Sequence, residues 1–145
     1  EISVSVKTYL GFDVGTKRTG VAIANSLTNK ASGIETVRNH KDGSTNWQQI
    51  DQIINKHPPD IIVVGVPYDE NNKEQEMIYI ARSFGRKIKD RFDIEVVFVD
   101  EHLSSSEAKN QLKWHYAHKN ADRSEVDMRS AQLILQTWLN ETRPD

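Results

Sequence analysis

The sequence predicts one α/β domain over residues 1–145, built on a mixed β-sheet. Three short strand-like runs come first, with no helical pattern between them. Helical stripes then alternate with two runs that are rich in β-branched and apolar residues. The first pattern indicates antiparallel strands, and the second indicates parallel strands joined by right-handed crossovers.

The first strands are expected at Tyr9–Val14, Gly20–Ala24 and Gly33–Arg38. The short polar segment Thr16–Thr19 joins the first two, which predicts a hairpin. A helix follows the polar cluster Asp42–Thr45 and ends at two prolines. Its apolar stripe consists of Trp47, Ile50, Ile53 and Ile54.

The second half of the chain alternates strands with helices. Ile61–Val66 is expected to be a central strand covered on both faces, and Ile94–Val99 another buried strand. A helix between them has a stripe formed by Met77, Ala81, Phe84 and Ile88. The capping box Ser104–Glu107 opens a further helix. The stretch His115–Arg123 lacks apolar periodicity and is expected to be a loop, and Val126–Leu139 a final amphipathic helix.

Composition excludes several kinds of site. The chain has no cysteine, which excludes a disulfide framework, a cysteine zinc site and a cysteine nucleophile. No apolar run approaches the roughly 18 residues needed to span a bilayer. The first residues lack the basic-then-apolar order of a signal peptide, so we expect a cytoplasmic protein with no membrane partner.

The charge pattern gives mixed indications of a nucleic-acid partner. The net charge of −2 lacks the basic excess typical of nucleic-acid-binding domains. Basic residues nevertheless cluster at Lys17 and Arg18, along residues 82–91, and between Lys109 and Arg123. Solvated helix faces explain such clusters equally well.

Two acidic residues lie where packing would favour apolar side chains. Asp13 lies in the first strand, on the face that Tyr9 and Gly11 share, and burying an unpaired carboxylate is costly. Asp127 shares one face of the last helix with the apolar residues Ala131, Ile134 and Trp138. Two structural alternatives stay open: Asp13 could cap the following turn, and Asp127 could suit the positive end of the helix dipole.

Glu101 directly follows the strand Ile94–Val99, and sites of α/β proteins gather at the carboxyl ends of strands. An ordinary turn is the alternative. Three carboxylates that converge at one sheet edge would suit hard divalent cations such as Mg²⁺ or Mn²⁺. A pair of these ions stabilises the attacking and leaving oxygens in phosphodiester hydrolysis. Lys17 and Arg18 would then lie near the phosphate that is cleaved or near an adjacent one.

Four motifs, in order along the chain, resemble those of the YqgF/RuvX family. The first is Gly11–Ala22, and the second is Ile62–Pro67. Asp100–Ala108 resembles the family's Asp-Glu-Arg-Leu-Ser-Thr-x-Glu-Ala motif. The last motif consists of Val126 and Asp127 with Ala131, Ile134, Leu135 and Gln136.

The resemblance implies an RNase H-like fold, with a five-stranded mixed sheet and helices on both faces. It implies a nuclease in which Asp13, Glu101 and Asp127 are catalytic residues and metal ligands. The family is described as acting at the 5′ end of pre-16S ribosomal RNA in ribosome biogenesis, and also as a Holliday-junction resolvase. The expected partners are nucleic acids, with RNA favoured and branched DNA as the alternative, and ribosomal precursor particles. The chain itself is expected to be a monomer or a weak homodimer.

Further substrate contacts are expected from residues close to these motifs: Lys17, Arg18, His102, Ser104, Lys119 and Arg123. His102 stands where the family usually has Arg, although a neutral His can still donate one hydrogen bond.

The strand order usual for this fold, 3-2-1-4-5, places the strand before Glu101 two positions from that of Asp13. Their separation is then roughly 10 Å before side chains reach inward. Asp69 and Glu70, after the intervening strand, are candidate substitutes for Glu101.

Other functions stay open. Gly11–Thr16 also resembles the phosphate loop of actin-like and sugar kinases, but those enzymes need two lobes to enclose ATP. A non-catalytic nucleic-acid-binding or ribosome-assembly module would fit the low net charge and His102. We also hypothesise that residues 115–123 are mobile and close over substrate, and that the group Trp114–Tyr116 stacks on single-stranded bases.

Overall fold

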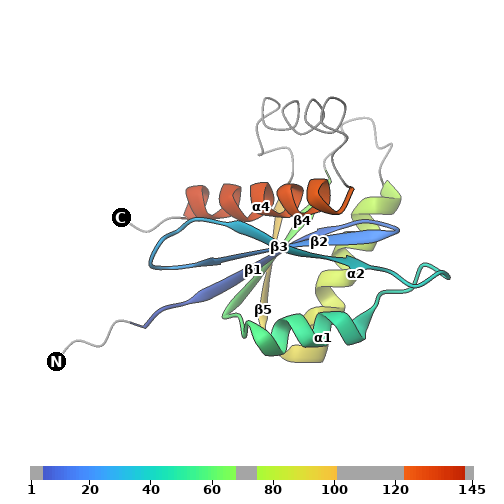
Figure 1. Cartoon of the computed structure of the whole chain (residues 1–145), viewed down its shortest axis with the longest axis horizontal. Helices are drawn as coiled ribbons and strands as arrows, with labels where there is room; N and C mark the ends of the chain where they lie inside the picture. The colour runs from blue at the N-terminus through green and yellow to red at the C-terminus, as the bar shows by residue number, and fades with distance from the viewer. Residues whose placement is uncertain (1–4, 68–74, 101–122, 143–145) are drawn as a thin grey trace.

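The computed structural model describes residues 5–67, 75–100 and 123–142. Its helices and strands are β1 (Thr8–Val14), β2 (Arg18–Asn25), β3 (Ser32–Arg38), α1 (Trp47–Lys56), β4 (Ile61–Val66), α2 (Gln75–Phe92), β5 (Glu95–Asp100) and α4 (Arg123–Thr142) (Figure 1). The predicted helix after Ser104, the group Trp114–Tyr116 and residues 115–122 of the predicted loop lie outside the described residues. None of the described helices has the length and apolar character that crossing a membrane requires.

The strands form a five-stranded sheet in the order β3-β2-β1-β4-β5. β2 is antiparallel to both β1 and β3, whereas β4 is parallel to β1 and β5 is parallel to β4. α2 makes the crossover from β4 to β5, because parallel neighbours cannot be joined by a tight turn. The predicted mixed sheet and strand order are confirmed.

Helices cover both faces of the sheet (Figure 1). α1 and α2 pack on the face that carries Leu10 and Phe12, and α4 packs on the face that carries Tyr9. β1 contributes side chains to both faces, because successive side chains of a strand point to opposite faces of the sheet. Arg91 of α2 binds Asp51 of α1 at 2.8 Å, and this hydrogen-bonded partner lowers the pKa of the Asp51 carboxyl.

The hairpin turn is shorter than predicted. Arg18 and Thr19 belong to β2 rather than to the connection, because Thr19 pairs with Val14 in the ladder. A Cβ on Gly15 would lie 2.6 Å from the carbonyl oxygen of Arg18, so the absence of a side chain permits this tight turn. The turn therefore presents Lys17 and Arg18 directly at the start of β2.

The prediction that Ile94–Val99 is a buried strand was only partly right. β5 is the last strand of the described sheet, and Val99 is buried while Val96–Phe98 are only partly buried. An edge strand has a neighbour on one side only, so an apolar run alone does not show that a strand is buried along its whole length.

The last helix begins at Arg123 rather than at the predicted Val126, so Arg123 is helical and not part of a loop. Asp127 therefore lies beyond the first turn, where Glu125 is the acidic residue. Because the helix dipole acts mainly within the first turn, it does not explain Asp127.

Candidate active site

α4 lies close to the sheet because glycines face it from three neighbouring strands. These glycines are Gly33 on β3, Gly20 on β2 and Gly11 on β1. Added Cβ atoms on Gly33 and Gly11 would each lie 2.8 Å from the Cβ of Met128 and of Leu135, respectively. A Cβ on Gly20 would overlap the carbonyl oxygen of Asp127. We call these three positions the glycine trough, and α4 packs closely against them.

Asp13 and Asp127 meet at Gly20. Asp13 pairs with Gly20 in the β1–β2 ladder, where opposed Cα atoms are roughly 4.5–5.5 Å apart. The backbone of α4 at Asp127 rests on the same glycine. Asp13 alternates with Phe12 along β1, so it shares the sheet face that α4 covers. The structure thus brings two of the three predicted acids to one end of one face, and both are half-buried.

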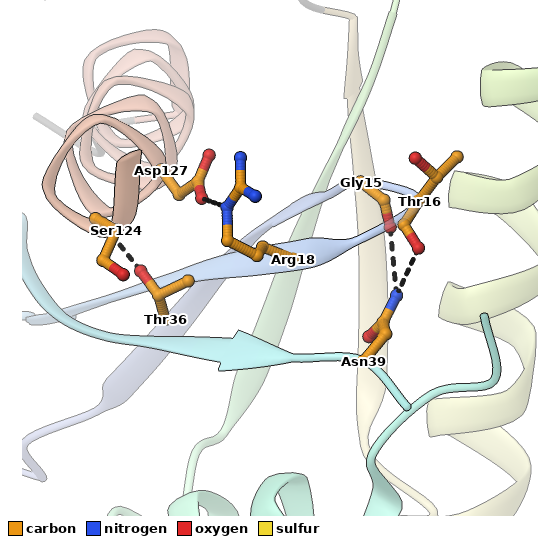
Figure 2. Close-up of polar contacts among 7 residues, drawn as sticks. All are labelled: Gly15, Thr16, Arg18, Thr36, Asn39, Ser124 and Asp127. Carbon is orange, nitrogen blue, oxygen red and sulfur yellow. Dashed lines mark hydrogen bonds and ion pairs between the residues drawn. The ribbon is translucent and has the colours of Figure 1, made fainter. Parts of the chain in front are cut away.

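Arg18 binds Asp127 directly (Figure 2). Its Nε donates a hydrogen bond to Oδ2 of Asp127 at 2.6 Å, and the two side chains are 23% and 22% exposed. Sequence reasoning placed Arg18 near a phosphate and missed this ion pair. Thr36 on β3 donates to the carbonyl oxygen of Ser124 at 2.7 Å, which fixes the start of α4 on the sheet.

Asn39, just after β3, holds the hairpin turn in place (Figure 2). Its Nδ2 donates to the carbonyl oxygens of Gly15 at 3.3 Å and Thr16 at 3.0 Å. Its backbone N–H donates to the carbonyl oxygen of Lys17 at 2.9 Å. Sequence reasoning gave Asn39 no role, although it fixes the turn that carries Lys17 and Arg18. Lys17 itself is exposed, as a contact to substrate requires.

Three further basic residues lie beside this turn and were not predicted as site residues. Arg38 ends β3, and His40 and Lys41 follow it. Together with Lys17 and Arg18 they line a pocket of about 370 Å³. The sequence signal that could have revealed them is the basic run 38–41 at the end of a strand that pairs with the hairpin.

The other predicted site residues lie outside the described part of the chain. They are Glu101, its candidate substitutes Asp69 and Glu70, and the candidate substrate contacts His102, Ser104 and Lys119. Arg123 is described as the first residue of α4. Asp100, which precedes Glu101, ends β5, and β4 separates β5 from β1. Asp100 therefore lies at the same end of the sheet as Asp13, two strands away, in the strand order that was predicted.

The donor chemistry of Asp13 and Asp127 fits a hard divalent cation, because Mg²⁺ and Mn²⁺ prefer carboxylate oxygens. Within residues 5–67, 75–100 and 123–142, no group of three or more His, Cys, Asp and Glu side chains could hold a metal ion. A third protein ligand would therefore have to come from outside these ranges, where Glu101 lies.

Comparisons with known proteins identify the family to which this chain is similar. The family described as "RuvX: Holliday junction resolvase" matches residues 7–141. A protein of Aeromonas salmonicida (strain A449) named "Putative pre-16S rRNA nuclease" is 38% identical over 138 residues, which cover 95% of this chain and 98% of that protein. A protein of Nitrosococcus oceani with the same name is 38% identical over 132 residues, covering 91% and 86%. These similarities support a nuclease role.

Solved structures share the fold. RuvC of T. thermophilus, solved in complex with a Holliday junction substrate, has a TM-score of 0.61 at 12% identity and covers 92% of this chain and 94% of its own. The fowlpox virus resolvase, solved with Holliday junction DNA, has a TM-score of 0.54 at 12% identity and covers 94% and 99%. The likeness concerns the fold alone, and it confirms the RNase H-like fold that the motifs predicted.

Proposed function

This chain belongs to the RuvX family, and on that basis we propose that it is a nuclease that hydrolyses phosphodiester bonds with Mg²⁺ or Mn²⁺. We propose further that it acts on RNA, at the 5′ end of the 16S ribosomal RNA precursor, in ribosome biogenesis. The observation that carries the proposal is the meeting of Asp13 and Asp127 at Gly20, on the face of the sheet that α4 covers.

Asp13 and Asp127 would hold the cation, with Glu101 as the proposed third ligand. When bound, the cation supplies charge stabilisation at phosphate oxygens and makes a bound water more acidic. The chain's own contribution is rigidity: the β1 ladder holds Asp13, and the glycine trough holds Asp127. Such fixed charges need little reorganisation when charge develops on the phosphate.

Arg18 and Lys17 are proposed to bind the phosphate that reaches these acids. Arg18 uses its Nε for Asp127, and a guanidinium carries four further N–H donors that suit a phosphate. Lys17 is exposed in the same turn and adds a second positive charge. The turn thus places cations beside the acids, where an anionic substrate would otherwise be repelled.

Resolution of four-way DNA junctions is the second candidate, because the matching family is described as a Holliday junction resolvase. Symmetric cleavage of a junction needs two active sites related by a two-fold axis. The RNA and junction candidates therefore differ in substrate and in oligomeric state, and both are measurable.

The test is cleavage of three labelled substrates in Mg²⁺ or Mn²⁺: a 16S-precursor 5′ leader, a generic single-stranded RNA and a four-way DNA junction. Wild type is compared with Asp13→Asn and Asp127→Asn, which remove the charge but keep the shape. Asp90→Asn, which alters an exposed acid on α2, is the matched control. We expect the leader to be cut by wild type and control, a loss of about 100-fold or more in the site variants, and no cleavage after chelation.

Other outcomes of this assay would favour a different function. Cleavage of the junction but not of RNA would move the assignment to the second candidate. If no substrate is cut but RNA is still bound, a non-catalytic binding module becomes the better description. Wild-type rates in both site variants would remove Asp13 and Asp127 from the active site.

A further inference from the structure

The basic pocket beside the acids concentrates positive charge in a chain whose net charge is −2. Its cationic lining residues are Lys17, Arg18, Arg38 and Lys41, and His40 lies among them. Among the described residues that line it, none is acidic. The pocket is therefore a local electropositive site rather than part of a general basic surface.

Arg18 and Arg38 are direct partners in the β2–β3 ladder. Like charges directly opposite each other on a sheet repel, which is unfavourable unless an anion offsets them. Asp127 offsets Arg18, but no ion pair within the described ranges involves Arg38, which is exposed. An anion bound beside Arg38 would relieve this repulsion.

The backbone around the pocket is already ordered. The N–H of His40 donates to the carbonyl oxygen of Ser44, and the N–H of Gly43 donates to that of His40, both at 2.9 Å. Asp42, the acid within this loop, accepts from the N–H of Ser44 at 2.9 Å and from its hydroxyl at 2.6 Å. The Ser44 hydrogen bonds lower the pKa of Asp42 and engage its carboxylate within the loop. The backbone that carries these basic side chains is therefore already ordered, which reduces the conformational entropy lost when an anion binds.

Arg18 connects the pocket to the acids, because it lines the pocket and also binds Asp127 at 2.6 Å. We propose that Arg38 and Lys41 of the pocket bind a backbone phosphate of the RNA strand, next to the phosphate that Arg18 and Lys17 hold at Asp13 and Asp127. This proposal rests on the proposed function, which places the cleaved phosphate at the acids. Backbone contacts position a nucleic acid without reading its sequence. The pocket would therefore set which bond of the strand reaches the acids.

The test measures binding of single-stranded RNA in EDTA, where no cleavage occurs, over salt concentrations from about 50 to 200 mM. The pocket variant is Arg38→Ala/Lys41→Ala. The matched control is Arg86→Ala/Lys89→Ala, which removes the same charge from exposed positions on α2. We expect the pocket variant to bind about tenfold more weakly, and the slope of log affinity against log salt to fall by about 0.7 for each lost phosphate contact. The control should keep the wild-type slope.

The cleavage assay adds an independent readout. Loss of a positioning contact should raise KM, leave kcat near wild type, and spread cleavage over neighbouring bonds. Equal salt slopes in the pocket variant and wild type, or equal losses in the control, would overturn the pocket. If the pocket variant lowers the salt slope as expected but wild type cleaves no substrate, the proposed nuclease activity is overturned and the proposed phosphate site is supported.

Two further arms keep the result interpretable. RNAs with a 5′ phosphate and a 5′ hydroxyl are compared, and an effect confined to the first would assign the pocket to a terminal phosphate and overturn the backbone assignment. Arg38 and Lys41 are exposed, so thermal melting of the variant should match wild type. If the double variant does not fold, Lys41→Ala alone must still lower the salt slope.

Discussion

At the scale of single residues, the Arg18–Asp127 ion pair bears directly on the proposed cation site, because it holds one of the two acids. Asp127 lies beside Asp13, and two nearby carboxylates repel each other. Arg18 offsets this repulsion, although about a fifth of each side chain of the pair is exposed, so the gain is modest. A cation that takes Asp127 as a ligand must therefore share the carboxylate with Arg18 or displace it.

We predict that Arg18→Ala binds Mn²⁺ several-fold more tightly and binds RNA more weakly, with slower cleavage. The cation no longer competes with a guanidinium, whereas the phosphate loses a donor. Mn²⁺ affinity is measured by calorimetry without RNA, and RNA affinity is measured in EDTA.

Arg91→Ala is the matched control, because it also removes a guanidinium from an ion pair, on the opposite face of the sheet. It should change neither affinity. Unchanged Mn²⁺ binding in Arg18→Ala would mean that the ion pair and the cation do not compete for Asp127.

At the scale of elements, the glycine trough sets the height of α4 above the sheet. A Cβ added at Gly20 would overlap the carbonyl oxygen of Asp127, whereas a Cβ added at Gly11 would lie 2.8 Å from the Cβ of Leu135. Neither obstacle can rotate away, because both atoms are fixed to the backbone of α4, but the overlap at Gly20 is larger and falls at Asp127 itself. Gly20 therefore couples the packing of α4 to the position of the Asp127 carboxylate.

We predict that Gly20→Ala lowers the free energy of unfolding by about 1–3 kcal/mol, the usual cost of overpacking. It should also slow cleavage by about 100-fold, the cost of displacing a catalytic group by about 1 Å. Chemical denaturation gives the first value, and initial rates on the RNA leader give the second.

Gly11→Ala is the comparison, since it adds the same methyl group under the same helix. Its rate should stay much closer to wild type, because the overlap is smaller and falls at Leu135, about two helical turns from Asp127. Cleavage at the wild-type rate by a stably folded Gly20→Ala protein would show that the packing of α4 on Gly20 does not position Asp127.

At the scale of the whole molecule, the periodicity of apolar residues predicted the strands, the helices and the faces that they bury. It did not predict contacts between residues far apart in the sequence. Alternation in β1 placed Asp13 opposite Phe12, and helical spacing placed Asp127 on the apolar face of its helix, but only the structure shows that this helix covers the face that carries Asp13. The Arg18–Asp127 contact joins residues 109 positions apart, and only the helix height above Gly20 brings them within reach. The basic pocket was missed for a similar reason, since Arg38 faces Arg18 only through the ladder register.

The oligomeric state of the whole molecule separates the two candidate functions. Trimming one RNA end needs a single active site, whereas paired cuts in a four-way junction need two sites related by a two-fold axis. We therefore predict that the chain sediments as a monomer with and without RNA, and that its cleavage rate per chain does not change with protein concentration. A stable dimer that cuts junctions at symmetric positions would contradict the RNA assignment. A rate per chain that rises with protein concentration would show that the active form is a transient dimer.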